Sequence, residues 1–218
     1  MLAELAVTLT LRPWSVTGDV VPRFAEQGFG PDAIEAACGV VAVFNYLTRV
    51  ADATGIEFDY RSPLPAFQPD PDQAVPIPPG PESWPVIAGQ ARAVPRFRAL
   101  REAWRAWHDY VFESDEPLSR PERLLLARGA AEESCDRWRA DRLREYEPQD
   151  KAQTRLDEFG RKLAREPWRM RPDDLDVLRD AGYPEPALLH AIAVVALQSA
   201  ESRLVMGLAA AGLAAAAT

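Results

Sequence analysis

Apolar residues recur at helical spacing along most of the chain, and no segment has the sustained alternation of apolar and polar positions that indicates a β-strand. Residues 31–55 carry a wide apolar band and end at Gly55, a residue that favours the C-terminal cap of a helix. Residues 86–113 and 120–146 show the same helical period. The pattern therefore predicts an all-α protein.

A proline-rich stretch interrupts these helices. Residues 61–85 contain the prolines at positions 63, 65, 69, 71, 76, 78, 79, 81 and 85. Proline lacks an amide donor and has a fixed φ, so this stretch is expected to be an extended linker. We expect an N-terminal unit at residues 1–60, the linker at 61–85, and a C-terminal unit at 86–218.

The chain also contains an internal similarity, because a shift of 154 residues aligns residues 9–55 with 163–209 without a gap. Each copy predicts a helix end, a Pro-Trp turn, a short helix, a glycine corner and a long helix. The identical pairs include Leu9/Leu163, Pro13/Pro167, Trp14/Trp168, Asp19/Asp173, Gly28/Gly182, Ala33/Ala187, Ala37/Ala191, Val40/Val194, Val41/Val195, Ala42/Ala196 and Arg49/Arg203. Gly28 and Gly182 are expected to have positive φ, which glycine adopts at no steric cost. We expect the two copies to superpose.

Composition narrows the function classes. The 218 residues suffice for one large domain or two small ones, and 25 basic against 33 acidic side chains give a net charge of −8. Without a basic run, a nucleic-acid partner is not expected. The only cysteines, Cys38 and Cys135, exclude a disulfide framework, and with His108 and His190 they form no convincing metal site. We therefore expect no metal and no cofactor.

Neither end of the chain predicts a membrane or targeting segment. Glu4 stands where a signal peptide has a positive charge, and the first apolar stretch ends at Arg12. Residues 191–216 are rich in Ala, Val and Leu, but polar residues between Gln198 and Arg203 interrupt them. This segment is expected to be a buried helix, and the protein to be cytoplasmic without a membrane partner.

Two motifs resemble the carboxymuconolactone decarboxylase and alkylhydroperoxidase D superfamily, and most closely its peroxidase-related branch. The unit Leu-Arg-x-Ala-Gly-Tyr at residues 178–183, followed by a long helix, is similar to the C-terminal half of that fold. Residues 44–49 are similar to the Phe-Asn-x-x-Asn-Arg signature of the branch, with Thr48 in place of the second Asn. The resemblance implies one complete unit at 86–218, which includes the second copy at 160–212, preceded by an extra half-unit at 1–60.

The resemblance also points to site residues. In the peroxidase members, a Glu is followed by cysteines twelve and fifteen residues later and by a His after nineteen. From Glu122, these positions are Ser134, Arg137 and Asp141, and none has the family's residue type. Trp138 agrees with a Trp-x-x-His ending found in members without the cysteines, with Asp141 in place of the His.

Spacing within residues 120–146 leads to a specific hypothesis about these positions. On one continuous helix, Ser134, Arg137, Trp138 and Asp141 share a face, and Glu122 approaches it from the helix start. They predict a buried ionic cluster, which is either an anion-binding or acid/base pocket or a salt-bridge network that fixes packing. In the buried case, Arg137→Ala is expected to be severely destabilising.

Other candidates have alternative interpretations that the sequence leaves open. Glu122 also completes a capping box with Ser119, in which its carboxylate binds the N-cap amide. Cys135 lies one position past the slot of the first family cysteine and is either a peroxide-reactive thiol or a packing residue. His108 is either a packing residue or the one general base near the site.

Three functions remain at this point. The first is a non-catalytic binding or assembly role, favoured because every transferred catalytic position has the wrong residue type, with self-assembly into a homo-oligomer as one form of it. The second is a cofactor-free decarboxylase, isomerase or hydrolase that acts on a small organic acid through Glu122 or Asp141. The third is a peroxidase-like antioxidant protein that uses Cys135.

Overall fold

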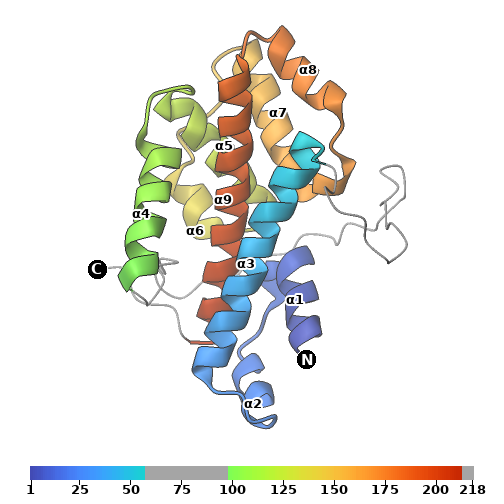
Figure 1. Cartoon of the computed structure of the whole chain (residues 1–218), viewed down its shortest axis with the longest axis vertical. Coiled ribbons are helices and arrows are strands. Elements are labelled where there is room, and N and C mark those ends of the chain that lie inside the picture. Colours follow the sequence, from blue (N-terminus) through green and yellow to red (C-terminus); the bar gives the residue numbers. More distant parts are fainter. Residues whose placement is uncertain (57–97, 213–218) are drawn as a thin grey trace.

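The protein is described by a computed structural model that covers residues 1–56 and 98–212, and every regular element in these ranges is a helix (Figure 1). The predicted all-α class is confirmed. The predicted linker at 61–85 and the first part of the predicted helix at 86–113 lie outside the described residues.

The helices form three consecutive groups along the chain. The N-terminal group contains α1 (Leu2–Leu11), the 3-10 turn η1 (Pro13–Ser15), α2 (Val20–Ala25) and α3 (Pro31–Thr54). The middle group contains α4 (Arg98–Glu113), α5 (Arg120–Glu133) and α6 (Arg137–Arg142). The C-terminal group contains α7 (Lys151–Arg165), η2 (Pro167–Arg169), α8 (Pro172–Asp180) and α9 (Glu185–Ala210).

The first and last groups have matching elements at the offset found in the sequence. The 3-10 turns η1 and η2, and the starts of α3 and α9, are each 154 residues apart. Gly28 has φ 80° and Gly182 has φ 98°, so the expected positive φ occurs at both corners. Gly55 caps α3 with φ 65°, as its position predicts.

Helices α3 and α9 pack against each other along the centre of the molecule and run in opposite directions (Figure 1). Their contact depends on small residues, because a Cβ at Gly207 of α9 would lie 2.8 Å from Cys38 Sγ of α3. The larger apolar core joins α9 to α4, α5, α7 and α8, and a smaller one joins α1, α2 and α3 to the end of α9.

Two buried arginines connect the first and last groups. Arg49 of α3 donates from Nη2 to the carbonyl oxygen of Ala164 (2.8 Å), in the last turn of α7. Arg203 of α9 donates from Nη2 to the carbonyl oxygen of Thr10 (3.0 Å), in the last turn of α1. The interaction is reciprocal, because donors and acceptors are both 154 residues apart. Carbonyls at a helix C-terminus carry partial negative charge, so each guanidinium neutralises a helix end.

Both guanidiniums are withdrawn from water. Arg49 is 3% and Arg203 is 5% exposed, and each also donates from Nη1 to the carbonyl four residues earlier, at Asn45 (3.0 Å) and Ser199 (2.9 Å). Burial lowers the pKa of Arg49 to about 10, so it stays protonated at pH 7. Burial also lowers the pKa of Arg203, and the positive charge of Arg49 lowers it further.

The predicted continuous helix over residues 120–146 is wrong, because the chain breaks between α5 and α6. Cys135 adopts the left-handed conformation with φ 55°, which ends the helical path. Asp136 then caps α6, because its carboxylate accepts a hydrogen bond from the backbone N–H of Arg139 (3.2 Å). Ser134, Arg137, Trp138 and Asp141 therefore do not share one helix face, because Ser134 precedes the break.

Replacement of Arg203 by methionine should lower the free energy of unfolding by about 2–3 kcal/mol, because the carbonyl of Thr10 at the end of α1 loses its charged donor. Urea denaturation measures this change. The control is Arg165→Met, at a side chain that is 47% exposed and pairs with Glu133 and Glu166, where we expect less than about 1 kcal/mol. Equal losses of unfolding free energy in the two variants would contradict the proposed contribution of the buried Arg203 contact to stability.

Candidate functional site

The predicted buried ionic cluster is not present. Arg137 Nε lies 3.5 Å from Asp141 Oδ2, but the two side chains are 55% and 68% exposed. Trp138 lies beneath the guanidiniums of Arg139 and Arg142, at 5.7 Å and 4.9 Å from its ring centroid. The prediction that Arg137 is buried between two acids is therefore wrong, because the break before α6 turns this pair to solvent.

Glu122 forms the capping box that its spacing from Ser119 allowed. Its Oε2 accepts hydrogen bonds from Ser119 N (3.0 Å) and Ser119 Oγ (2.6 Å). Its Oε1 accepts from the hydroxyl of Tyr183 (3.0 Å), in the corner before α9. Both carboxylate oxygens thus join the start of α5 to that corner, and Arg137 and Asp141 are not among the contacts of Glu122 in the structure.

The two thiols are unsuited to nucleophilic chemistry. Cys38 and Cys135 are both free and buried. Burial raises the pKa of each thiol to about 11, and the charges of Glu35 and Glu133 add to the effect. A peroxide-reactive cysteine needs a lowered pKa, so the environment of Cys135 opposes this role.

Instead, the structure brings a different set of polar residues together where α4, α6 and α9 meet. Arg139 Nη2 lies 3.0 Å from Glu201 Oε2, and His108 Nε2 lies 3.8 Å from Glu201 Oε1. A second chain of hydrogen bonds runs from Gln198 Nε2 to Ser202 Oγ (3.0 Å) and from Ser202 Oγ to Asp136 Oδ2 (2.8 Å). We call this set the α9 polar cluster: His108, Asp136, Arg139, Gln198, Glu201 and Ser202.

The two acids of the α9 polar cluster are almost fully buried. Glu201 is 5% and Asp136 is 3% exposed, and burial raises the pKa of both carboxyl groups. Arg139 and His108 oppose this rise at Glu201, whereas the charge of Asp136 adds to it. Buried carboxylates remain charged at low cost only when they are paired and hydrogen-bonded, and Arg139 provides the pairing.

Of the predicted site residues, only His108 belongs to the α9 polar cluster. Ser134 lies at its edge, where its hydroxyl oxygen accepts a hydrogen bond from Arg203 Nη1 (3.4 Å). The pattern of the sequence did not identify Asp136, Glu201 or Arg139. The available signal was the run from Gln198 to Arg203, in which five polar residues occupy buried positions of α9.

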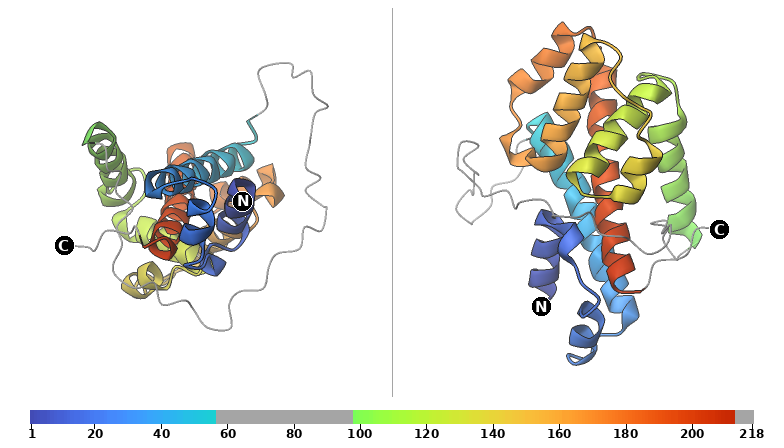
Figure 2. Two further views of the ribbon diagram at one scale, coloured as in Figure 1. Left: turned by 90° about the horizontal axis from the view of Figure 1, so that it is seen from below. Right: turned by 180° about the vertical axis from the view of Figure 1, so that it is seen from behind.

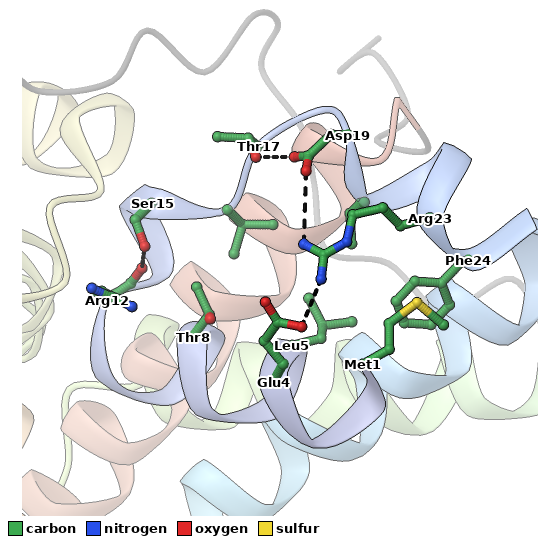
Figure 3. Close-up of a pocket in the computed structure, with 12 residues that line it drawn as sticks. Met1, Glu4, Leu5, Thr8, Arg12, Ser15, Thr17, Asp19, Arg23 and Phe24 are labelled. Carbon is green, nitrogen blue, oxygen red and sulfur yellow. Dashed lines mark hydrogen bonds and ion pairs between the residues drawn. The ribbon is translucent and has the colours of Figure 1, made fainter. Parts of the chain in front are cut away.

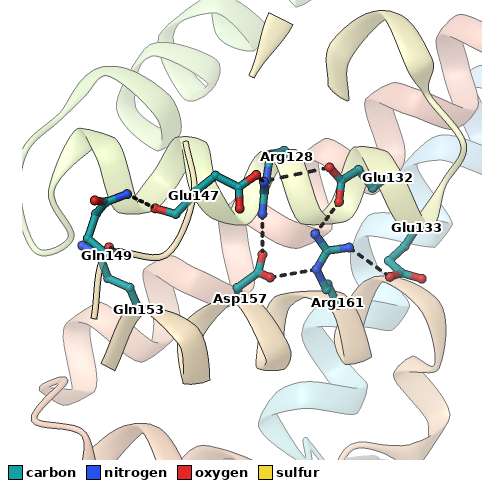
Figure 4. A network of polar contacts seen from close by, with 8 residues as sticks. All are labelled: Arg128, Glu132, Glu133, Glu147, Gln149, Gln153, Asp157 and Arg161. Carbon is teal, nitrogen blue, oxygen red and sulfur yellow. Dashed lines mark hydrogen bonds and ion pairs between the residues drawn. The ribbon is translucent and has the colours of Figure 1, made fainter. Parts of the chain in front are cut away.

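A second ionic network joins α5 to α7 (Figure 4). Arg128 pairs with Glu147 and lies 3.8 Å from Asp157, while Arg161 Nε lies 2.8 Å from Asp157 Oδ2. The helices are close here, because a Cβ at Gly129 would lie 3.0 Å from Asp157 Oδ1. This network fixes α5 against α7 and therefore has a structural explanation.

A hollow of about 280 Å³ lies beside α1 and α2 (Figure 3). Arg23 points into it, but its guanidinium is held 2.6 Å from Glu4 Oε2 and 3.7 Å from Asp19 Oδ2. Arg23 is thus neutralised by the protein's own acids. Among the described residues, no three His, Cys, Asp or Glu side chains are grouped to hold a metal ion.

The most distinctive surface lies on α3 and α1. Val40, Val43, Phe44 and Leu47 form a stripe along α3, and their exposures are 57%, 52%, 61% and 51%. The α9 positions 154 residues later are 0–5% exposed, namely Val194, Leu197, Gln198 and Glu201. Leu2 of α1 is likewise 46% exposed, whereas its counterpart Leu156 is 0%.

The middle group of helices explains why these side chains are exposed on α3 and buried on α9. Helix α5 packs on both α7 and α9, and α4 also contacts α9. Seen from behind, α5 and α6 lie over part of α9, whereas in the front view no described helix lies over α3 and α1 (Figures 1 and 2). We call the uncovered surface the open face, and it comprises Leu2, Val7, Val40, Val43, Phe44 and Leu47.

By length and composition alone, α3 and α9 could each cross a membrane. In this fold α9 is mostly enclosed by protein, and α3 carries the buried Arg49 on its inner side. One or two such helices are weak evidence for a membrane span, because a core helix of a folded domain, as α9 is here, passes the same test.

No protein-family model, curated protein or solved structure matches the chain. The features of the chain that bear on its function are therefore the α9 polar cluster, the thiols and the open face.

Arg139→Ala should lower the free energy of unfolding by about 2–4 kcal/mol at pH 7, because it leaves Glu201 buried without its arginine. The loss should shrink as the pH falls toward 4.5. Arg139 holds the pKa of Glu201 down against burial, so its removal raises that pKa further. The variant's native state then binds the proton more tightly than the parent's, and protonation recovers part of its stability at low pH. Chemical denaturation at several pH values measures both effects.

The matched control is Arg137→Ala, two positions earlier on the same helix. Its partner Asp141 is exposed, so we expect a change of at most about 1 kcal/mol, without this pH dependence. Similar pH profiles for the two variants would exclude the assigned role of Arg139.

Native Cys38 and Cys135 should react slowly with a thiol reagent at pH 7.5, because their pKa values of about 11 leave little thiolate and both are buried. Full labelling should require denaturant. A stopped-flow titration of the native protein measures the rate, with free cysteine as the reference. Labelling of Cys135 as fast as free cysteine would restore the peroxidase hypothesis.

Proposed function

We propose that the protein is a non-catalytic assembly module that binds a second copy of itself through the open face. The observation that carries the proposal is the exposure of the α3 stripe, at positions whose counterparts on α9 are buried. Half-exposed apolar side chains gathered on one face of a monomer are typical of an interaction surface.

We further propose that the chain is a diverged relative of the alkylhydroperoxidase D-like proteins, with a complete unit at 86–218 after a half-unit at 1–60. The element offsets between the first and last groups support a duplication of the helix-corner-helix unit. In this scheme, the half-unit lacks the helices that would cover its long helix. The open face is the surface that results.

The contacts at the candidate catalytic positions favour a non-catalytic role. Glu122 is occupied by Ser119 and Tyr183, and Asp141 is an exposed partner of Arg137. An enzyme acting on a small organic acid would need these groups to converge on a shared pocket. A peroxidase would need a lowered thiol pKa at Cys135, and burial has the opposite effect.

The composition of the open face favours a second copy as the partner. Ala36, Val40, Val43 and Leu47 follow one another at spacings of four, three and four residues, the heptad spacing of helices that pack on other helices. These side chains carry no charge. An uncharged face of this kind is complementary to itself, because its burial against an identical face leaves no ion unpaired.

Sedimentation velocity over a range of protein concentrations tests the proposal. We expect the natural chain to form dimers and Val43→Glu to remain monomeric, because the interface would bury an unpaired carboxylate. The dissociation constant should rise by at least about 100-fold, equivalent to about 3 kcal/mol. The control is Val177→Glu on α8, where the valine is 44% exposed and lies outside the open face.

The control variant should dimerise as the natural chain does, and both variants should keep the helical circular-dichroism spectrum of the parent. A natural chain that stays monomeric at about 100 μM, a concentration far above the dissociation constants of stable complexes, would refute self-assembly. Dimers that tolerate Val43→Glu would refute the assigned surface.

A further inference from the structure

We infer that two copies dock with their α3 helices antiparallel, each α3 lying over its partner's α3 stripe and beside its partner's α1. This inference rests on the proposed self-assembly and specifies its geometry. It follows from three observations, which concern the groove, the residues on its walls and the symmetry of the α3 stripe.

The first observation is how closely α5 sits on the C-terminal group. A Cβ at Gly160 of α7 would lie 2.7 Å from Leu126 Cδ2 of α5, so a small residue on α7 lets the two helices approach. The residue 154 positions earlier is Ala6 of α1, which is also small. The N-terminal group thus keeps the close-approach position but has no described helix over it.

The second observation identifies the kind of helix that fits. On α7, Asp157 and Arg161 form ion pairs with charged residues of α5, including Arg128 and Glu132. Their counterparts on α1 are Ala3 and Val7, which are apolar. A charged helix like α5 would bury unpaired ions in this groove, whereas the uncharged stripe of a second α3 would not.

The third observation is the symmetry of the stripe along α3. Val40, Val43, Phe44 and Leu47 are arranged symmetrically about the point between Val43 and Phe44, and Ala36 and Ala51 lie at equal distances beyond the two ends of the stripe. An antiparallel partner with its two-fold axis at that point places Val40 opposite the partner's Leu47, and Val43 opposite the partner's Phe44. Small residues, Ala36 and Ala51, then meet at both ends of the contact.

The antiparallel direction also has an electrostatic basis. Side-by-side helices are favoured when their dipoles oppose each other, and α3 and α9 already pack antiparallel within the chain (Figure 1). Beneath the stripe, the amide of the buried Asn45 donates to Thr10 Oγ1 of α1 (3.0 Å), so α1 lies beside α3 next to the proposed contact.

Thiol cross-linking tests this arrangement. Val40→Cys and Leu47→Cys are made separately, mixed, allowed to exchange subunits, and treated with a short bismaleimide. The mixture should give at least about fivefold more covalent dimer than either variant alone, because only unlike positions face each other across an antiparallel seam. The doubly substituted chain should cross-link more completely still. The natural chain is the control, because Cys38 and Cys135 are buried.

The outcomes distinguish failure of the antiparallel arrangement from failure of self-assembly itself. Efficient cross-linking of Val40→Cys with itself would mean parallel α3 helices and would overturn the inference. Sedimentation dimers without cross-links in the mixture would also overturn it and leave self-assembly standing. A monomeric natural chain would overturn both, and binding of that monomer to phosphatidylcholine vesicles would assign the open face to a lipid surface.

Discussion

The rest of the structure depends on the reciprocal contact in which two buried arginines cap helices of the opposite group. Arg49 binds the end of α7 and Arg203 binds the end of α1, so each long helix holds the terminus of the other group's first helix. A guanidinium suits this task because its planar donors reach several carbonyls at once and its charge balances a helix dipole. These contacts fix the packing of α3 on α9.

The pair of α3 and α9 presents one comparable face on each helix. The middle helices cover the face on α9 and leave the face on α3 exposed. On the α9 side, α4, α5 and α6 cover the helix and enclose the α9 polar cluster, in which Arg139 balances Glu201. On the α3 side, the described helices leave Phe44 and its neighbours exposed. The proposed assembly follows from this asymmetry, because a second copy would cover α3 as the middle helices cover α9.

The buried acids Asp136 and Glu201 lie on the covered face of α9 and are paired there with protein side chains. Glu201 occupies the α9 position that corresponds to Leu47 on α3, so the covered face carries a carboxylate where the open face carries a leucine. Glu201 is buried against Arg139 and His108, which balance its charge. An apolar face needs no such partner and can be buried against an identical surface. The two faces therefore differ in the partner that their chemistry accepts.

The sequence by itself determined the all-α class, the bounds of α3, the glycine corners at Gly28 and Gly182, and the offset that relates the two long helices, because periodicity and capping are local properties. It also allowed the capping box of Glu122. Only the tertiary structure decided the rest. The left-handed turn at Cys135 broke the helix on which Arg137 and Asp141 were predicted to face inward, and Asp136 and Arg139 of α6 met Glu201 of α9. Such pairings depend on long-range packing, for which local spacing contains no information.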